Sequence, residues 1–284
     1  ARLWTDGRYF IQAAAQLKGT TVELMKMGEP GVPEMNAYIE EVLKEGETLG
    51  FDGRVVSVGE GEGYAAIAGK KNAKVNYQVD LIDEIWEDRP VLSEEPAFNL
   101  DVKYAGETVA SKLARIREEM KEAGTNVHVV STIDDICWTL NIRGNDIDFF
   151  PLVLSYGIIT MDSFELYIDE KKLDDKLKAK LAKDGVNLQP YNDIYEDVKK
   201  FGSDVVAMID PGKLNYALFN NIPENVKTVE KRNPAILMKA IKNPVEIENI
   251  RKAQIKDSVA HVRFMKWLKE NVGKMRITEM SASD

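Results

Sequence analysis

Cysteine and histidine are nearly absent from this chain. Cys137 is the only cysteine among 284 residues, and the only histidines are His128 and His261. A single cysteine cannot form an internal disulfide and is typical of a reducing compartment, so we expect a cytoplasmic location. Neither histidine has a carboxylate-rich segment at ligand spacing, so the sequence predicts no metal site within this chain.

Long apolar runs and a surplus of basic residues are missing too. No apolar stretch approaches the roughly 20 residues that a membrane-spanning helix needs. The 38 Lys and Arg residues are outnumbered by 47 Asp and Glu residues, which gives a net charge of −9. Nucleic-acid binders need a basic surface that displaces counterions from phosphate, so we expect neither nucleic acid nor a membrane as a partner.

What the chain has is an alternation of strand-like and helix-like segments. Its hydrophobic content of 44% and charged content of 30% are typical of a globular protein. The alternation predicts an α/β fold with mixed sheets flanked by helices. We expect strands at 3–9, 21–27, 48–51, 73–78, 126–131, 152–159, 163–169, 186–189 and 204–209. We expect helices at 9–17, 35–43, 61–68, 107–123, 133–140, 174–183 and 192–201.

The clearest single element is a long helix near the end of the chain. Asn243 is a good N-cap, Pro244 suits the first helical position, and Glu246 completes a capping box. Apolar or small residues then recur with a helical period at Ile247, Ile250, Ala253, Ala260, Phe264 and Trp267. Only seventeen residues follow Trp267, so we interpret this helix as the entrance to a further domain and expect its apolar side chains to be exposed.

A weak internal repeat supports the expectation that the chain is a piece of a longer protein. Residues 3–24 and 166–188 share the order strand, helix, strand, and in each copy the first strand ends in Asp. The second copy is preceded by about sixty residues that the first copy lacks. We therefore expect the chain to be truncated at both ends.

Several sequence blocks, in order along the chain, resemble one family. They are WTDGRYF at 4–10, LMKMG at 24–28, LIDEIWEDRP at 81–90, DDICWTLNIRGNDI at 134–147 and KAIKN at 239–243. Together they resemble the three-domain Xaa-Pro aminopeptidases, also called aminopeptidase P. The resemblance covers nearly the whole chain.

This resemblance implies a domain organisation. It implies two creatinase/prolidase N-terminal-type domains, followed by a C-terminal catalytic domain of the pita-bread fold. We expect an incomplete first domain at 1–90, a linker at 91–104, a second domain at 105–232 and the start of the metallopeptidase domain at 233–284.

The resemblance also implies the activity and partners of the whole protein. Family members remove the N-terminal residue that precedes proline, with two manganese ions held by ligands in the third domain. This chain would then be inactive by itself and bind no manganese. Its partners would be the missing catalytic domain of the same polypeptide, peptides with proline in the second position, and a second copy in a homodimer. Its contribution would be to shape the substrate cleft.

No catalytic residue is predicted, but three residues are candidates for substrate contact. Asn141 and Arg143 lie in the segment NIRG, and Arg8 lies in the segment DGR. Arginine beside glycine can grip a carboxylate or a peptide carbonyl with two parallel hydrogen bonds. In the resembling enzymes the NIRG loop faces the catalytic cleft. The alternative is that Arg143 pairs with Asp146 or Asp148 and fixes the loop.

Structural interpretations are preferred for the other conspicuous residues. We expect His128 to be a core histidine with satisfied hydrogen bonds, and His261 to pack. Cys137 should be a small buried residue rather than a nucleophile, because no base is apparent nearby.

The acidic and glycine-rich segments receive structural interpretations as well. Asp134 and Asp135 should cap the helix that contains Trp138. The Asp-x-Asp pair at 146–148 should belong to a solvated loop, and the glycine-rich segment at 59–63 should form a flexible turn.

Two other functions remain open. The chain could be a non-catalytic peptide- or protein-binding module of the pita-bread superfamily. It could also be a stand-alone α/β protein that binds a small molecule.

Overall fold

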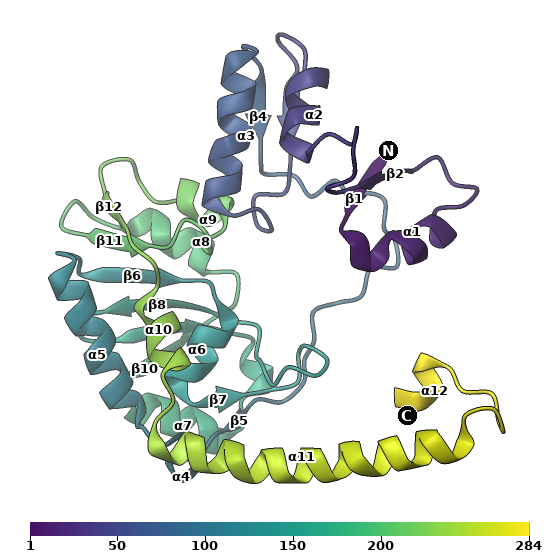
Figure 1. The fold of residues 1–284 in the computed structure, drawn as a ribbon. Coiled ribbons are helices and arrows are strands. Elements are labelled where there is room, and N and C mark those ends of the chain that lie inside the picture. Colours follow the sequence, from purple (N-terminus) through teal and green to yellow (C-terminus); the bar gives the residue numbers. More distant parts are fainter. Residues whose placement is uncertain (284) are drawn as a thin grey trace.

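A six-stranded sheet forms the centre of the larger part of the molecule. The computed structural model describes residues 1–283, and its strands follow the order β10-β9-β8-β6-β11-β12 (Figure 1). β8 runs antiparallel to both neighbours, and every other neighbouring pair is parallel. The strands are β6 Val127–Val130, β8 Tyr156–Thr160, β9 Phe164–Tyr167, β10 Val186–Gln189, β11 Val206–Ile209 and β12 Lys227–Glu230.

Helices cover this sheet on both faces. Adjacent strand residues point to opposite faces, so Leu166 joins a buried cluster with Leu181 while Tyr167 joins another with Leu218. This confirms the predicted mixed sheet flanked by helices. The helices of this part are α4 Val102–Ala105, α5 Val109–Glu122, α6 Ile133–Leu140, η2 Glu170–Lys172, α7 Asp175–Lys183, α8 Ile194–Asp197, η3 Val198–Lys200, α9 Tyr216–Asn220 and α10 Pro234–Ala240.

The smaller, N-terminal part contains two separate parallel strand pairs, β1 with β2 and β3 with β4. Its elements are β1 Arg2–Thr5, η1 Gly7–Tyr9, α1 Phe10–Gln16, β2 Glu23–Lys26, α2 Met35–Val42, β3 Thr48–Gly50, α3 Val58–Lys70 and β4 Lys74–Asn76. The predicted repeat recurs in space, because β1-α1-β2 and β9-α7-β10 each place a helix between two parallel strands.

Backbone hydrogen bonds join the smaller part to the larger one. Val58 N donates to Leu214 O at 2.9 Å, and Tyr216 N donates to Val56 O at 2.8 Å. The Tyr216 ring lies so close to Gly61 of α3 that a Cβ atom at Gly61 would overlap it. The glycine-rich segment 59–63 lies within the helix α3, so our prediction of a flexible turn was wrong. The glycine at position 61 allows close packing against an aromatic ring.

The segment between the two parts has little regular structure until β5 Phe98–Asn99, which pairs antiparallel with β7 Ile142–Arg143. β5 lies within the predicted linker at 91–104, and α4 begins in it and ends at Ala105. The four domain boundaries remain a prediction.

Three predictions about the large sheet and its helices were wrong in detail. The strand that ends at Ile209 is not the last one, because β12 adds a further parallel edge strand. The helix predicted at 192–201 is two short pieces, α8 and η3, and the helices α9 and α10 were missed. Each missed element is five to seven residues long or lies at an edge, where sequence periodicity is weak.

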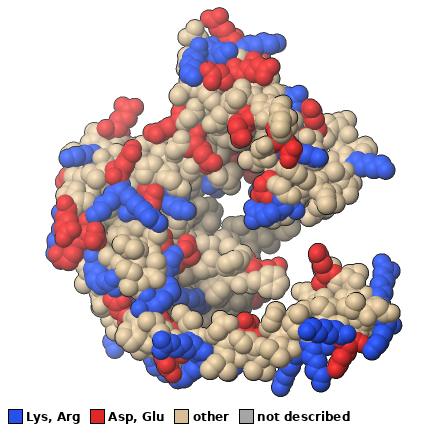
Figure 2. Space-filling view, viewed as in Figure 1, with Lys and Arg blue, Asp and Glu red and all other residues tan. Residues whose placement is uncertain are grey.

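The long helix α11 Pro244–Asn271 extends away from the sheet, and α12 Glu279–Ser283 follows it (Figure 1). Its predicted capping box is present, with Glu246 N donating to Asn243 Oδ1 at 3.0 Å. Asn243 Nδ2 also donates to Ala105 O at 2.8 Å, which anchors the start of α11 to α4. Figure 2 shows a hollow between the N-terminal part and the region of α11 and α12.

No residue of α11 is buried. Ile247 and Ile250 are 38% and 50% exposed, as expected. Phe264 and Trp267 are only partly exposed, and their rings stack with centroids 6.0 Å apart. A second apolar stripe was missed; it consists of Ile255, Val259 and Val262. Within residues 1–283, no helix has the length and apolar character needed to cross a bilayer.

Candidate functional site

The carboxyl ends of five strands meet at one edge of the six-stranded sheet. β6, β9, β10, β11 and β12 all end there, and β8 begins there. In α/β sheets, ligands commonly bind in the crevice at this edge, where the chain switches from one side of the sheet to the other. Here that crevice lies between β6 and β11. The segments that follow these two strands contribute side chains to a polar network.

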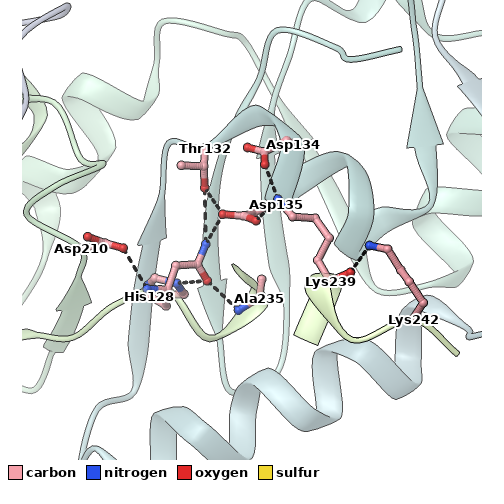
Figure 3. A network of polar contacts seen from close by, with 9 residues as sticks. His128, Thr132, Asp134, Asp135, Asp210, Ala235, Lys239 and Lys242 are labelled. Atoms are coloured by element: carbon pink, nitrogen blue, oxygen red, sulfur yellow. Dashed lines mark hydrogen bonds and ion pairs between the residues drawn. The ribbon is translucent and has the colours of Figure 1, made fainter. Parts of the chain in front are cut away.

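The network begins at the buried ring of His128. Its Nδ1 lies 3.1 Å from Met208 O and its Nε2 lies 3.2 Å from Asn233 Oδ1. Asn233 Nδ2 donates to Asp135 Oδ2 at 2.9 Å, and Asn233 Oδ1 accepts the Ala235 amide at 3.0 Å (Figure 3). Burial lowers the pKa of His128 and outweighs the two contacts that favour its protonated form. His128 is thus a core histidine, as expected, but the neutral ring has one N–H and can donate to only one of these two oxygens at a time.

Charged groups close the network on its outer side. Thr132 Oγ1 donates to Asp135 Oδ2 at 2.6 Å, and Lys239 pairs with Asp134 and, at 2.7 Å, with Asp135 Oδ1 (Figure 3). Thr132 is the N-cap of α6 and makes no capping bond from its side chain. The two aspartates lie within the first turn, so the prediction that they cap α6 was wrong. They tie α6 to α10 through Lys239.

A cavity of about 420 Å³ lies over these groups. Both oxygens of Asp210 in its wall accept backbone amides, from Gly212 at 3.2 Å and from Asn233 at 3.0 Å. All three carboxylates of this wall are thus already engaged within the protein. The arrangement holds β6, β11 and α10 together.

Asn141 and Arg143 lie close together after α6. Asn141 ends α6 in the left-handed conformation, with φ 53°. It is buried: its Oδ1 accepts Lys112 Nζ at 2.6 Å and its Nδ2 donates to Glu107 O at 2.9 Å. Lys112 also donates to Trp138 O at 2.7 Å, and burial lowers its pKa to about 8. Asn141 therefore holds the NIRG segment in place from inside.

Arg143 is half-buried, and within the described part of the chain one of its three guanidinium nitrogens is engaged. Nη1 donates to Cys137 O and to Ile142 O, each at 2.8 Å. Within residues 1–283, the other guanidinium nitrogens make no hydrogen bond. The alternative pairing of Arg143 with Asp146 or Asp148 was wrong, because the partner of Asp146 is Lys172 at 2.5 Å.

Asp146 begins a short exposed loop. Its buried carboxylate also accepts the Leu154 amide at 2.7 Å. At the tip, Phe149 is fully exposed and has φ 66°, a conformation that non-glycine residues rarely adopt. The prediction of a solvated Asp-x-Asp loop was wrong for Asp146.

Arg8 lies in η1, in the N-terminal part, away from the NIRG segment along the chain. It is exposed and pairs with Asp6 at 2.7 Å, which lowers the pKa of Asp6 to about 2. The structure thus brings Asn141 and Arg143 together but places Arg8 in a different element.

The remaining conspicuous residues carry no site. Cys137 is buried, and burial raises the pKa of its thiol to about 11, in line with a packing role. His261 is exposed on α11, so the prediction that it packs was wrong for this chain. Among residues 1–283, no three His, Cys, Asp or Glu side chains are grouped so that they could hold a metal ion.

Sequence reasoning missed the buried lysines Lys112 and Lys172 and the central role of Asn233. Lysine is rarely buried, and nothing local marks either one. Asn233 precedes Pro234, a helix-start pattern that could have revealed α10.

Comparison with known proteins agrees with this fold. The sequence profile of the creatinase/prolidase N-terminal domain matches residues 88–246. The chain belongs to the creatinase/prolidase N-terminal domain family. The curated relatives that match it include Xaa-Pro aminopeptidases.

Several curated relatives match the whole chain, and two of them serve as examples. They are aminopeptidase P2 of Arabidopsis thaliana, 33% identical, and the Xaa-Pro aminopeptidase app-1 of Caenorhabditis elegans, 34% identical. A crystal structure of the X-prolyl aminopeptidase from Caenorhabditis elegans, described as a cytosolic enzyme with a di-nuclear active site, superimposes on 99% of the chain with a TM-score of 0.92 and 32% identity. The chain spans about half the length of these relatives: 44% and 47% of the two sequences and 47% of the structure.

Proposed function

We propose that this chain is the N-terminal, non-catalytic portion of a metal-dependent, cytoplasmic Xaa-Pro aminopeptidase. The observation that carries this proposal is the TM-score of 0.92 over 99% of the chain with an X-prolyl aminopeptidase. The whole protein would remove the N-terminal residue that precedes proline. This portion shapes the substrate cleft and supports a homodimer.

The residues present do not fit the metal centre that the family implies. No suitable group of ligands exists among residues 1–283, so we assign no catalytic step to this chain. In the proposed whole protein, two manganese ions are held by a C-terminal catalytic domain of the same polypeptide.

α11 supports the proposed contact with that domain. Ile255 and Val262 are 67% and 65% exposed, an unusual degree of exposure for large apolar side chains on one stripe. Burying them stabilises a complex by about 25 cal/mol per Å² of apolar surface. The same helix is anchored to α4 through Asn243, so a domain packed on α11 is held at a defined position relative to the NIRG segment.

Arg143 is the residue we propose for substrate contact. Its unengaged guanidinium nitrogens can donate to a carboxylate or a peptide carbonyl, and Nη1 is held by two backbone carbonyls. Asn141 acts indirectly, because its buried side chain holds the NIRG segment in position. Arg8 is a weaker candidate, because Asp6 already engages its guanidinium.

The test compares the 284-residue chain with the protein encoded by the gene including its downstream coding sequence. Both are assayed with manganese and a peptide that has proline in the second position. We expect cleavage by the longer protein only. Cleavage by the 284-residue chain would refute its assignment as non-catalytic. An inactive longer protein that still binds peptides would favour the binding-module alternative.

A variant of the longer protein tests Arg143. We expect Arg143→Gln to lower kcat/KM by about 10-fold or more, the loss of one charge-assisted hydrogen bond. Arg115→Gln is the matched control, because Arg115 is exposed and pairs with Glu107 at 3.0 Å. Equal effects of the two variants would remove Arg143 from the substrate site.

A further inference from the structure

Lys112 of α5 is a buried cation that makes no ion pair within residues 1–283. Its side chain is 1% exposed, and its Nζ donates to two uncharged oxygens, Trp138 O at 2.7 Å and Asn141 Oδ1 at 2.6 Å. Nζ also lies 4.3 Å from the centre of the Trp138 ring. Burying a charge costs free energy, and burial lowers the pKa of Lys112 to about 8. An apolar side chain of similar length would fill this position without that cost, so packing alone does not explain a lysine here.

The two contacts of Lys112 hold the end of α6 in place. The last carbonyl groups of a helix have no partner within the helix, and Lys112 binds one of them, Trp138 O. Asn141 ends the helix in the left-handed conformation, and its backbone amide donates to Cys137 O and Trp138 O. A positive charge at the C-terminus of a helix is also favoured by the helix dipole. Lys112 therefore fixes the turn at which the chain leaves α6.

Arg143 is attached to the same turn. Its Nη1 donates to Cys137 O and to Ile142 O, each at 2.8 Å. Cys137 directly precedes Trp138, so the two cations bind adjacent carbonyl groups at the end of α6. Because Nη1 is the attached nitrogen, the direction of Nε and Nη2 depends on where these carbonyl groups lie. A displaced end of α6 would move the donors of Arg143 that the proposed function assigns to the substrate.

The first turn of α11 acts on the same two cations. Burial lowers the pKa of Lys112 and of Arg143, and attraction by the Glu246 carboxylate opposes this effect for both. Glu246 is itself fixed, because its Oε2 accepts the Asn243 amide at 2.9 Å in the capping box. The surroundings of Arg143 therefore include the start of the helix that the proposed function assigns to contact with the catalytic domain.

We propose that Lys112 is a positioning residue for Arg143. By holding the end of α6, it fixes the direction in which the unengaged guanidinium nitrogens of Arg143 point. Lys112 is buried and acts only through other residues. The proposal rests on the proposed function, because the role of Arg143 in substrate contact comes from there.

The order of the Arg143 side chain can be measured in the 284-residue chain without any activity. The probe is the Nε–Hε signal of Arg143 in the isotopically labelled chain, assigned by its loss in Arg143→Gln. We expect its heteronuclear nuclear Overhauser effect to be close to that of the backbone amides of α6 and clearly above that of Arg251, which is exposed on α11. Equal mobility of Arg143 and Arg251 in the parent chain would overturn the proposal.

Two variants on α5 test whether Lys112 provides this order. Lys112→Met removes the charged donor with little change in volume, so the Arg143 effect should fall towards that of Arg251. Lys121→Met is the matched control, because Lys121 is an exposed lysine of the same helix that pairs with Glu118 at 2.6 Å. Circular dichroism checks folding, and Lys112→Gln is measured instead where Lys112→Met does not fold. An unchanged Arg143 signal, or an equal change in Lys121→Met, would overturn the proposal.

Kinetics of the longer protein separate positioning from a purely structural role. Lys112→Met should lower kcat/KM by about 3- to 10-fold, and the double variant Lys112→Met/Arg143→Gln should be no worse than Arg143→Gln alone. Losses that multiply in the double variant would show independent effects and overturn the proposal. A longer protein that cleaves no Xaa-Pro peptide would refute the proposed function instead, and the measurements on the 284-residue chain would still decide the role of Lys112.

Discussion

Lys172 and Asp146 form an ion pair that is shut off from water. Lys172 Nζ lies 2.5 Å from Asp146 Oδ2, and the two side chains are 3% and 0% exposed. Asp146 Oδ1 has no hydrogen-bond partner among residues 1–283. This pair attaches the loop that contains Phe149 to η2. The two paired residues are twenty-six positions apart in the sequence.

Breaking that pair should be costly. Lys172→Met leaves the Asp146 carboxylate buried without a counter-charge, so we expect a loss of about 3–5 kcal/mol in the free energy of unfolding, measured by urea denaturation. Lys171→Met, which removes an exposed pair with Glu94, should change the free energy of unfolding far less, because solvent screens that pair. The double variant Lys172→Met/Asp146→Leu should recover stability; a double variant no better than Lys172→Met would contradict this account.

His128 should make stability depend on pH. Its pKa is lowered in the folded state, so below about pH 6.5 the unfolded chain binds more protons and the free energy of unfolding decreases as the pH falls. Urea midpoints measured between pH 8 and pH 5 should show this decrease. His128→Gln should weaken the dependence in this window, whereas His261→Gln, at an exposed position, should leave it unchanged. Identical pH profiles for His128→Gln and the parent chain would exclude this role.

Cys137 should resist thiol reagents in the folded protein. Burial raises its pKa from 9.0 to about 11, which lowers the thiolate fraction at neutral pH by about 100-fold, and its side chain is inaccessible. Reaction with a disulfide reagent at pH 7.5 should therefore be at least that much slower in buffer than in concentrated urea. Rapid stoichiometric labelling of the folded chain would show that the thiol is reachable.

Two glycines of α3 should respond to alanine in opposite ways. Gly61→Ala forces a methyl group into the Tyr216 ring and should cost about 1–3 kcal/mol. Gly63 has open space around it, so Gly63→Ala should stabilise the chain by about 0.5–1 kcal/mol through better helix propensity. Urea denaturation of the two variants provides the comparison. A stabilising Gly61→Ala would mean that α3 and α9 are not packed as described.

Caps and short-range periodicity correctly predicted those helices and strands whose formation is decided by residues close to one another in the sequence. α6 and β10 have the predicted bounds, and the capping box of α11 is formed by Asn243 and Glu246 as expected. Caps and short-range periodicity act within a few residues, so they can be recognised along the sequence. By contrast, β12 and β7 depend on partners far along the chain, β11 and β5.

The candidate site was predicted in part. The NIRG segment was identified from its arginine and glycine. The alternative that Arg143 pairs with Asp146 or Asp148 did not anticipate Lys172 as the partner of Asp146. Lys112, which supports Asn141 from α5, was not expected at all. Both lysines reach their partners over more than twenty residues, and no local pattern reveals such a contact.

The sequence by itself determined the α/β class, the family resemblance and the start of α11, because composition, motifs and caps are local properties. Only the tertiary structure decided that Gly61 lies against Tyr216, that Lys172 neutralises Asp146, and that Lys112 of α5 binds the end of α6. Those relationships depend on how distant segments pack, and packing is settled by the burial and pairing of groups that have no proximity in the sequence.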